Sequence, residues 1–79
     1  MKVGNLEVLK VVWMQGDLEG QVGVIKTKDT ITKELKYFIG YARNYKTDNS
    51  EAEDIKQIIA WGTKFLQDEF IAKFSDIVT

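Results

Sequence analysis

Residues 35–61, "LKYFIGYARNYKTDNSEAEDIKQIIAW", contain the point at which the chain changes from strand-like to helix-like periodicity. Aromatic and β-branched side chains dominate the first eight residues, which is typical of a strand. From Ile55 onward, isoleucines recur on one side of a 3.6-residue repeat. Ser50 and Glu53 form a capping box that would begin this helix, and Gly62 is expected to end it. The stretch therefore predicts a strand followed by a helix.

The residues that precede this stretch have the composition of two further strands. Residues 3–14 are rich in valine and leucine, and residues 21–28 alternate between apolar and polar side chains. Turns at residues 15–20 and 29–32 separate these strands from each other and from the third. Consecutive strands joined by short turns pair as an antiparallel meander. We therefore expect a three-stranded antiparallel sheet over about residues 3–43, with the third strand at residues 33–42.

A second helical pattern follows Gly62, over residues 64–78. Large apolar residues recur there at spacings of three and four, namely Leu66, Phe70, Phe74 and Ile77. The two C-terminal helices are expected to span about residues 50–78. The order is three strands and then two helices, which predicts the α+β class, in a single domain over residues 1–79.

The composition restricts the chemistry that this chain can perform. None of its 79 residues is cysteine or histidine, which excludes disulfide bonds, ordinary zinc sites and catalysis by Ser-His-Asp or Cys-His groups. No pattern places two carboxylates together in an apolar pocket, as acid–base catalysis requires. We therefore expect a binding protein and not an enzyme, with neither cofactor nor metal.

The balance of charges restricts the partners. Eleven basic and twelve acidic residues leave a net charge of −1, with no basic stripe, so nucleic acid is an unlikely partner on this criterion. No apolar run is long enough to span a membrane, and charged residues interrupt the N-terminal segment where a signal peptide would be apolar. The sequence therefore predicts a cytoplasmic protein without membrane contact, and the lack of cysteine agrees with that compartment.

The first strand is apolar in both phases. Uninterrupted alternation would place Leu9, Val11 and Trp13 on one face of the sheet and Leu6, Val8, Val12 and Met14 on the other. Two short helices are expected to cover one face of a three-stranded sheet, so the second face should be buried by a second chain. The sequence therefore predicts a homo-oligomer, with interface residues Val11, Trp13 and Phe38. A groove for a different partner protein is the alternative.

The single arginine of the chain lies in the most distinctive polar cluster. Arg43 stands between Tyr41 and Tyr45, with Asn44 and Lys46 beside them. A guanidinium group binds phosphate through two parallel hydrogen bonds, and tyrosine rings stack on planar bases. These five residues predict a site for a small anionic nucleotide.

A structural role is the alternative for the same cluster. Arg43 would then pair with Asp48 or Glu51, and the tyrosines would pack where the subunits meet, because arginine and tyrosine are enriched at interfaces. Both roles hold if the site lies at the interface between subunits.

Two resemblances extend these predictions. Residues 16–28, "GDLEGQVGVIKTK", resemble the KOW element of small SH3-like RNA-binding domains, although the basic density of those domains is missing; RNA binding is therefore a further alternative. Residues 37–65, with "YFIGYARN" and "SEAEDIKQIIAWGTKF", resemble small phage and prophage proteins whose functions are mostly unassigned. More loosely, they are similar to the phage sponge proteins that counter Thoeris and CBASS immunity. That resemblance implies an oligomer that sequesters a cyclic nucleotide or cyclic ADP-ribose signal without cleaving it.

Overall fold

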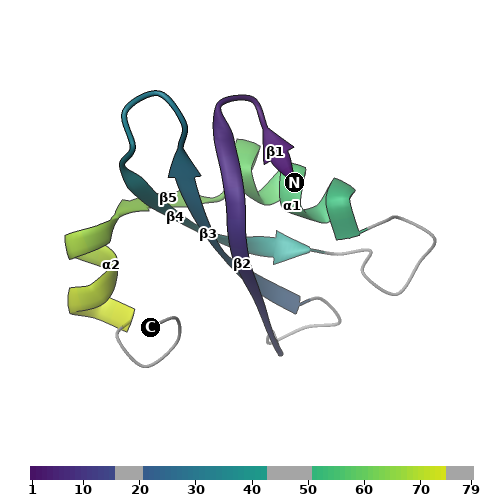
Figure 1. Ribbon diagram of the computed structural model, residues 1–79. Coiled ribbons are helices and arrows are strands. Elements are labelled where there is room, and N and C mark those ends of the chain that lie inside the picture. The colour runs from purple at the N-terminus through teal and green to yellow at the C-terminus, as the bar shows by residue number, and fades with distance from the viewer. Residues whose placement is uncertain (16–20, 43–50, 75–79) are drawn as a thin grey trace.

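The computed structural model describes residues 1–15, 21–42 and 51–74, and it shows an α+β protein with one antiparallel sheet (Figure 1). In chain order the elements are β1 (Lys2–Val3), β2 (Leu6–Gln15), β3 (Gln21–Asp29), β4 (Leu35–Ala42), α1 (Glu51–Trp61), β5 (Thr63–Leu66) and α2 (Gln67–Phe74). The five strands lie in the order β1-β2-β3-β4-β5. The predicted class is confirmed, whereas the predicted number of three strands is too low.

A tight turn divides the predicted first strand. β1 pairs with the beginning of β2, and Val3 lies opposite Leu6, so residues 4–5 form a two-residue hairpin turn. Gly4 has a φ of 60°, a left-handed conformation that glycine adopts without steric cost. The prediction of one continuous strand over residues 3–14 is therefore wrong at its start.

Helix α1 agrees with the sequence pattern. It begins at Glu51, carries three acidic residues in its first turn and ends at Trp61. Acidic side chains stabilise this end because they complement the partial positive charge of the helix N-terminus. Ser50, the predicted capping residue, lies outside the described residues.

The predicted second helix begins later than expected. Thr63–Leu66 is a strand, β5, that pairs with residues 36–39 of β4. α2 then starts at Gln67, where the Glu69 carboxylate accepts a hydrogen bond of 3.4 Å from the backbone N–H of Leu66. The helix predicted from residue 64 is wrong over its first turn. A strand there pairs with the backbone groups along the edge of β4, which a helix would leave unpaired.

The two helices cover opposite faces of the sheet. Phe38 is buried with Ile25, Ile55 and Ile58 in the cluster beneath α1. Its neighbour Tyr37 points to the other face, where it joins Val24 and Phe70 in the cluster beneath α2. The expectation that both helices cover one face, leaving the other for a second chain, is therefore wrong.

A β-bulge changes the face pattern of β2. The register with β3 shifts between Val8 and Lys10, so that two residues of β2 oppose one of β3. Even-numbered residues before the bulge therefore lie on the same face of the sheet as odd-numbered residues after it. Leu6, Val8, Val11 and Trp13 pack against the α1 cluster, and Val12 and Met14 pack against the α2 cluster. The faces expected from uninterrupted alternation are therefore wrong.

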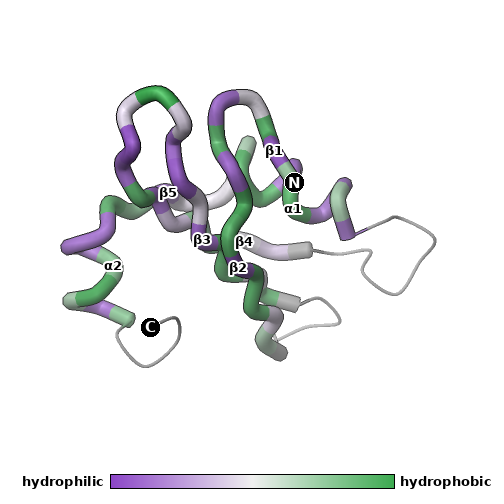
Figure 2. Tube along the Cα trace, in the orientation of Figure 1, coloured by the Kyte–Doolittle hydropathy of each residue, from purple (hydrophilic) through white to green (hydrophobic). Residues whose placement is uncertain are grey.

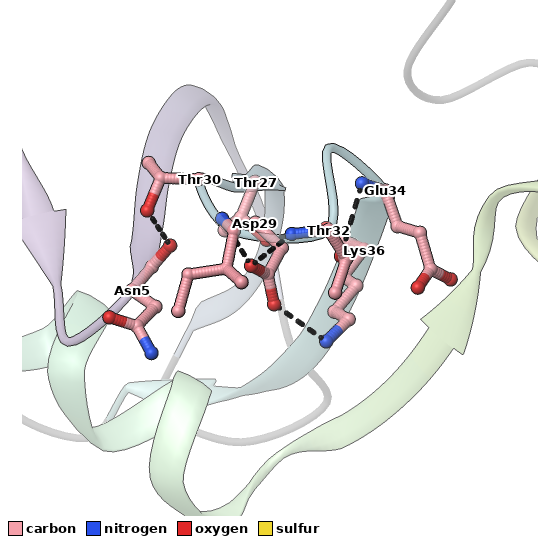
Figure 3. Close-up of polar contacts among 8 residues, drawn as sticks. Asn5, Thr27, Asp29, Thr30, Thr32, Glu34 and Lys36 are labelled. Carbon is pink, nitrogen blue, oxygen red and sulfur yellow. Dashed lines mark hydrogen bonds and ion pairs between the residues drawn. The ribbon is translucent and has the colours of Figure 1, made fainter.

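Polar contacts organise the turn between β3 and β4 (Figure 3). The Asp29 carboxylate accepts hydrogen bonds from the backbone N–H groups of Ile31, at 2.8 Å, and Thr32, at 3.1 Å. Its other oxygen lies 3.2 Å from the Lys36 ammonium. Thr30 donates through its backbone N–H and its hydroxyl to the Asn5 carbonyl, which connects this turn to the first hairpin. These contacts hold the two turns side by side.

Replacing Asp29 with asparagine is expected to reduce the dependence of stability on pH in acid. Backbone hydrogen bonds from Thr32 and Ile31, together with Lys36, lower the pKa of Asp29 below 3.8. Its charged form therefore stabilises the fold above pH 3.8, and this contribution disappears as the pH falls through the lowered pKa. Urea unfolding between about pH 6 and about pH 2.5 measures the effect.

Glu34→Gln is the matched control for this prediction. Glu34 is exposed in the same turn, and its carboxylate makes no ion pair within the described part of the chain. If Asp29→Asn retained the full acid dependence of the wild type, the proposed linkage would be wrong.

Candidate functional site

A cavity of about 520 Å³ lies where β4, α1 and β5 meet. Its lining comes from two strand ends, one helix end and the start of β5: Val22, Ile39, Gly40, Tyr41, Gln57, Ile58, Trp61, Gly62 and Thr63. β5 pairs with β4 only over residues 36–39. The cavity therefore lies at the part of the β4 edge that β5 does not reach.

Two glycines bring the end of α1 against the backbone of β4. A Cβ on Gly62 would lie 2.5 Å from the Ile58 carbonyl oxygen and 2.6 Å from the Ile39 carbonyl oxygen. A Cβ on Gly40 would lie 3.3 Å from the Gly62 Cα. The Gly62 N–H donates to the Ile58 carbonyl at 2.7 Å, so Gly62 closes the helix as predicted. Close approach of backbones, and not a left-handed conformation, requires glycine here.

Two aromatic side chains of the cavity are largely exposed. Tyr41 near the end of β4 is 62% exposed, and Trp61, the last residue of α1, is 87% exposed. Ile58, which lines the same cavity, is only 1% exposed and anchors the helix to the core. Exposed aromatic rings at a cavity are suited to contact with a planar ligand.

Polar groups complete the lining. The exposed side chains of Gln57 and Thr63 supply an amide and a hydroxyl group, both able to donate and accept hydrogen bonds. None of the described lining residues is charged. These groups are therefore suited to the uncharged, planar part of a ligand.

The predicted ligand cluster is only partly within the described structure. Tyr41 is one of the residues that line the cavity, and its role in binding a ligand stays a prediction. Arg43, Asn44, Tyr45 and Lys46 lie outside the described residues, so their role stays a prediction.

The sequence pattern does not mark the three aromatic or polar residues that line the cavity together with Tyr41. Trp61, Gln57 and Thr63 belong to a segment whose pattern predicts a helix and a helix end. One signal was present, because Trp61 follows Ile58 by three residues and thus lies at the border of the apolar helix face. The pairing of β5 with β4, which brings Thr63 to the cavity, has no comparable local signal.

The predicted interface residues have different positions. Phe38 is 5% exposed beneath α1, so it is not accessible to a partner on a sheet face, and this part of the prediction is wrong. Val11 and Trp13 are half-buried against the same cluster. The Trp13 indole N–H donates to the Glu51 carboxylate at 3.2 Å, which joins β2 to the first turn of α1.

The described carboxylates with altered pKa values lie outside the cavity lining. Asp54 is 3% exposed in the first turn of α1, and burial, reinforced by the charges of Glu51 and Glu53, raises its pKa above 3.8. Asp29 is the last residue of β3, and its carboxylate binds the turn that follows. Within the described residues no group of acidic, histidine or cysteine side chains is placed to hold a metal ion. Over the same residues, no helix is long and apolar enough to cross a membrane.

The fold and cavity define a small α+β protein with a five-stranded antiparallel sheet, a helix on each face and an aromatic-lined cavity at one edge of the sheet. Comparisons of this chain with protein-family models, with curated proteins and with solved structures give no match. The geometry and chemistry of the cavity therefore indicate what this protein can bind.

Proposed function

We propose that this protein is a non-enzymatic, cytoplasmic binding protein for a small nucleotide-like ligand, whose base stacks on Trp61 and Tyr41. The observation that carries the proposal is that two largely exposed rings line one cavity. Its volume of about 520 Å³ lies within the range of small-molecule sites, about 300–1,000 Å³. Gln57 and Thr63 would hydrogen-bond to the edge of the base.

The phosphate part of the ligand is assigned to the basic residues that follow the cavity in sequence. Arg43 and Lys46 come two and five residues after Tyr41. The planar guanidinium of Arg43 suits bidentate contact with a phosphate, and Lys46 adds a point charge. Asn44 and Tyr45 would supplement the polar and stacking contacts.

The ligand class follows from the resemblance to phage sponge proteins that sequester cyclic nucleotides or cyclic ADP-ribose. Such a protein binds its signal without cleaving it, in agreement with a chain that contains no histidine or cysteine. We therefore propose an anti-defence role, in which the protein lowers the concentration of an immune signal.

Trp61→Ala and Tyr41→Ala are each expected to weaken ligand binding about fivefold or more, because stacking of one base contributes about 1–3 kcal/mol. The test begins with thermal shifts against cyclic di- and trinucleotides and the cyclic forms of ADP-ribose. A ligand at a hundred times its Kd adds about 2.7 kcal/mol of stability. Isothermal titration then compares the variants with the wild type.

Ile31→Ala is the control for these variants, since Ile31 is 69% exposed in the turn between β3 and β4 and does not line the cavity. Arg43→Lys tests the phosphate contact, because lysine keeps the charge but loses the planar fork. The proposal fails if no compound in the panel shifts the melting temperature. A ligand that binds Trp61→Ala as tightly as the wild type would contradict the assigned site.

A further inference from the structure

The outer edge of β2 is mostly unpaired in the described structure. β1 pairs only with Leu6 and Glu7, and the N–H of Val8 donates to the Met1 carbonyl. Figure 1 shows the short β1 beside only one end of the long β2. For residues 9–15, no described strand lies on this side. This edge extends about 23 Å and presents backbone donors and acceptors that a further strand would satisfy.

The side chains along this edge are mainly apolar. Figure 2 shows hydrophobic residues along the part of β2 that β1 does not reach. Leu9 is 47% exposed, and the four apolar residues from Val11 to Met14 are half-buried. Lys10 is the one charged residue of residues 9–15, and the chain contains no proline to interrupt pairing. Proteins usually protect such edges with charges, prolines or covering segments.

We propose that the edge of β2 over residues 9–15 pairs antiparallel with the same edge of a second copy, forming a symmetric dimer with one continuous sheet. The twofold axis would pass through Val12, the middle residue of this edge. Val12 would face the partner's Val12, Val11 would face the partner's Trp13, and Lys10 would face the partner's Met14. An interface of this kind is isologous, because the same surface contributes from both subunits.

Charge and side-chain pairing favour this register. It uses all seven residues of the edge and brings no two lysines together. Pairing centred on Lys10 would instead place two like charges directly opposite, which is destabilising. In the proposed register a tryptophan pairs twice with a β-branched valine, a favourable cross-strand combination. Residues that face α1 in one subunit then lie beside residues that face α1 in the other.

This dimer differs from the one expected from the sequence. There the second chain was expected to cover a sheet face, whereas here it extends the sheet at its edge. Val11 and Trp13 remain interface residues, and the buried Phe38 does not. The inference is independent of the proposed ligand, because no residue of β2 lines the cavity.

Sedimentation equilibrium at micromolar concentration and disulfide mapping test the proposal together. The wild type is expected at twice the chain mass of 9.1 kDa. The chain contains no cysteine, so single cysteines report unambiguous contacts. Val12→Cys is expected to form a linked dimer at least about tenfold faster than Ile71→Cys, the exposed control on α2, because directly opposite Cβ atoms lie within reach of a disulfide.

Two further variants test the register. Lys10→Cys alone should link no faster than the control, since the two introduced cysteines of the dimer would lie about 13 Å apart along the strands. Lys10→Cys combined with Met14→Cys should link rapidly, and this pair keeps the test decisive if Val12→Cys does not fold. A single 9.1 kDa species at micromolar concentration would overturn the proposal. Rapid linkage of Lys10→Cys alone would also overturn it. So would slow linkage of both Val12→Cys and the double variant.

Discussion

Replacing Phe70 with alanine is expected to destabilise the protein by about 3–5 kcal/mol. Phe70 is 0% exposed, and its ring stacks on Tyr37 with centroids 4.2 Å apart and planes inclined by 7°. It also contacts the rings of Phe65 and Phe74, at centroid distances of 6.4 and 5.2 Å. Alanine would leave a cavity at the centre of this aromatic cluster and loosen the contact between α2 and the sheet.

Urea denaturation with far-UV circular dichroism measures this effect. A domain of this size has a total stability of about 5–10 kcal/mol, so this loss removes about a third of it or more and moves the unfolding midpoint to a much lower urea concentration. Ile71→Ala is the matched control on the same helix, since Ile71 is 46% exposed and should change stability by less than about 1 kcal/mol. Equal losses for the two variants would show that α2 does not pack on the sheet through Phe70.

Gly62→Ala is expected to destabilise the protein by about 3 kcal/mol, at the upper end of overpacking costs. The added Cβ would meet two backbone carbonyl oxygens, those of Ile58 at 2.5 Å and Ile39 at 2.6 Å. Backbone atoms within a helix and a strand cannot rotate away, so α1 and β4 would have to separate. The same separation would deform the cavity next to Trp61 and weaken ligand binding.

Gly23→Ala is the informative comparison for Gly62→Ala. A Cβ there would also have contacts at 2.6 Å, but with the ends of the Ile58 and Trp13 side chains. Such side chains adjust their rotamers, so a smaller loss is expected. Chemical denaturation of both variants measures the difference. If Gly62→Ala were as stable as the wild type, the close contact between α1 and β4 would be wrong.

Local patterns predicted several elements because each depends on neighbours in the chain. Residues 21–28 and 33–42 correspond closely to β3 and β4, and the isoleucine pattern after Ser50 corresponds to α1. The close packing at Gly62 shows the limit of such patterns. The sequence predicts that a helix ends at Gly62, but it does not predict the contact of Gly62 with β4. The α+β class followed from the order of these elements.

The bulge in β2 shows why the sheet faces could not be predicted. Uninterrupted alternation separates Val8 from Val11, yet both pack beneath α1 after the register shift. A bulge has no strong local signature in residues 6–15, because any of these residues fits a strand. The expectation of an uncovered face depended on that alternation and failed with it.

Residues that line the cavity differ in whether their neighbours in the chain mark them. Tyr41 lies two residues before the single arginine, which marks it in the sequence, whereas Thr63 reaches the cavity only through the pairing of β5 with β4. The helical spacing of Phe70 and Phe74 predicts a helix from residue 64, but residues 64–66 belong to β5, which pairs with the edge of the sheet.

The fold class, the main strands, the first helix and the exclusion of histidine and cysteine chemistry can be predicted from the chain alone, because they depend on composition and on periodicities within one element. The position of α1 and α2 on opposite faces, the addition of β1 and β5 to the sheet, and the cavity lined by Trp61 and Tyr41 arise only in the folded molecule. They arise there because pairing and packing satisfy backbone and apolar groups that lie far apart in the chain. The energy of such contacts overrides the preference of a short segment considered alone.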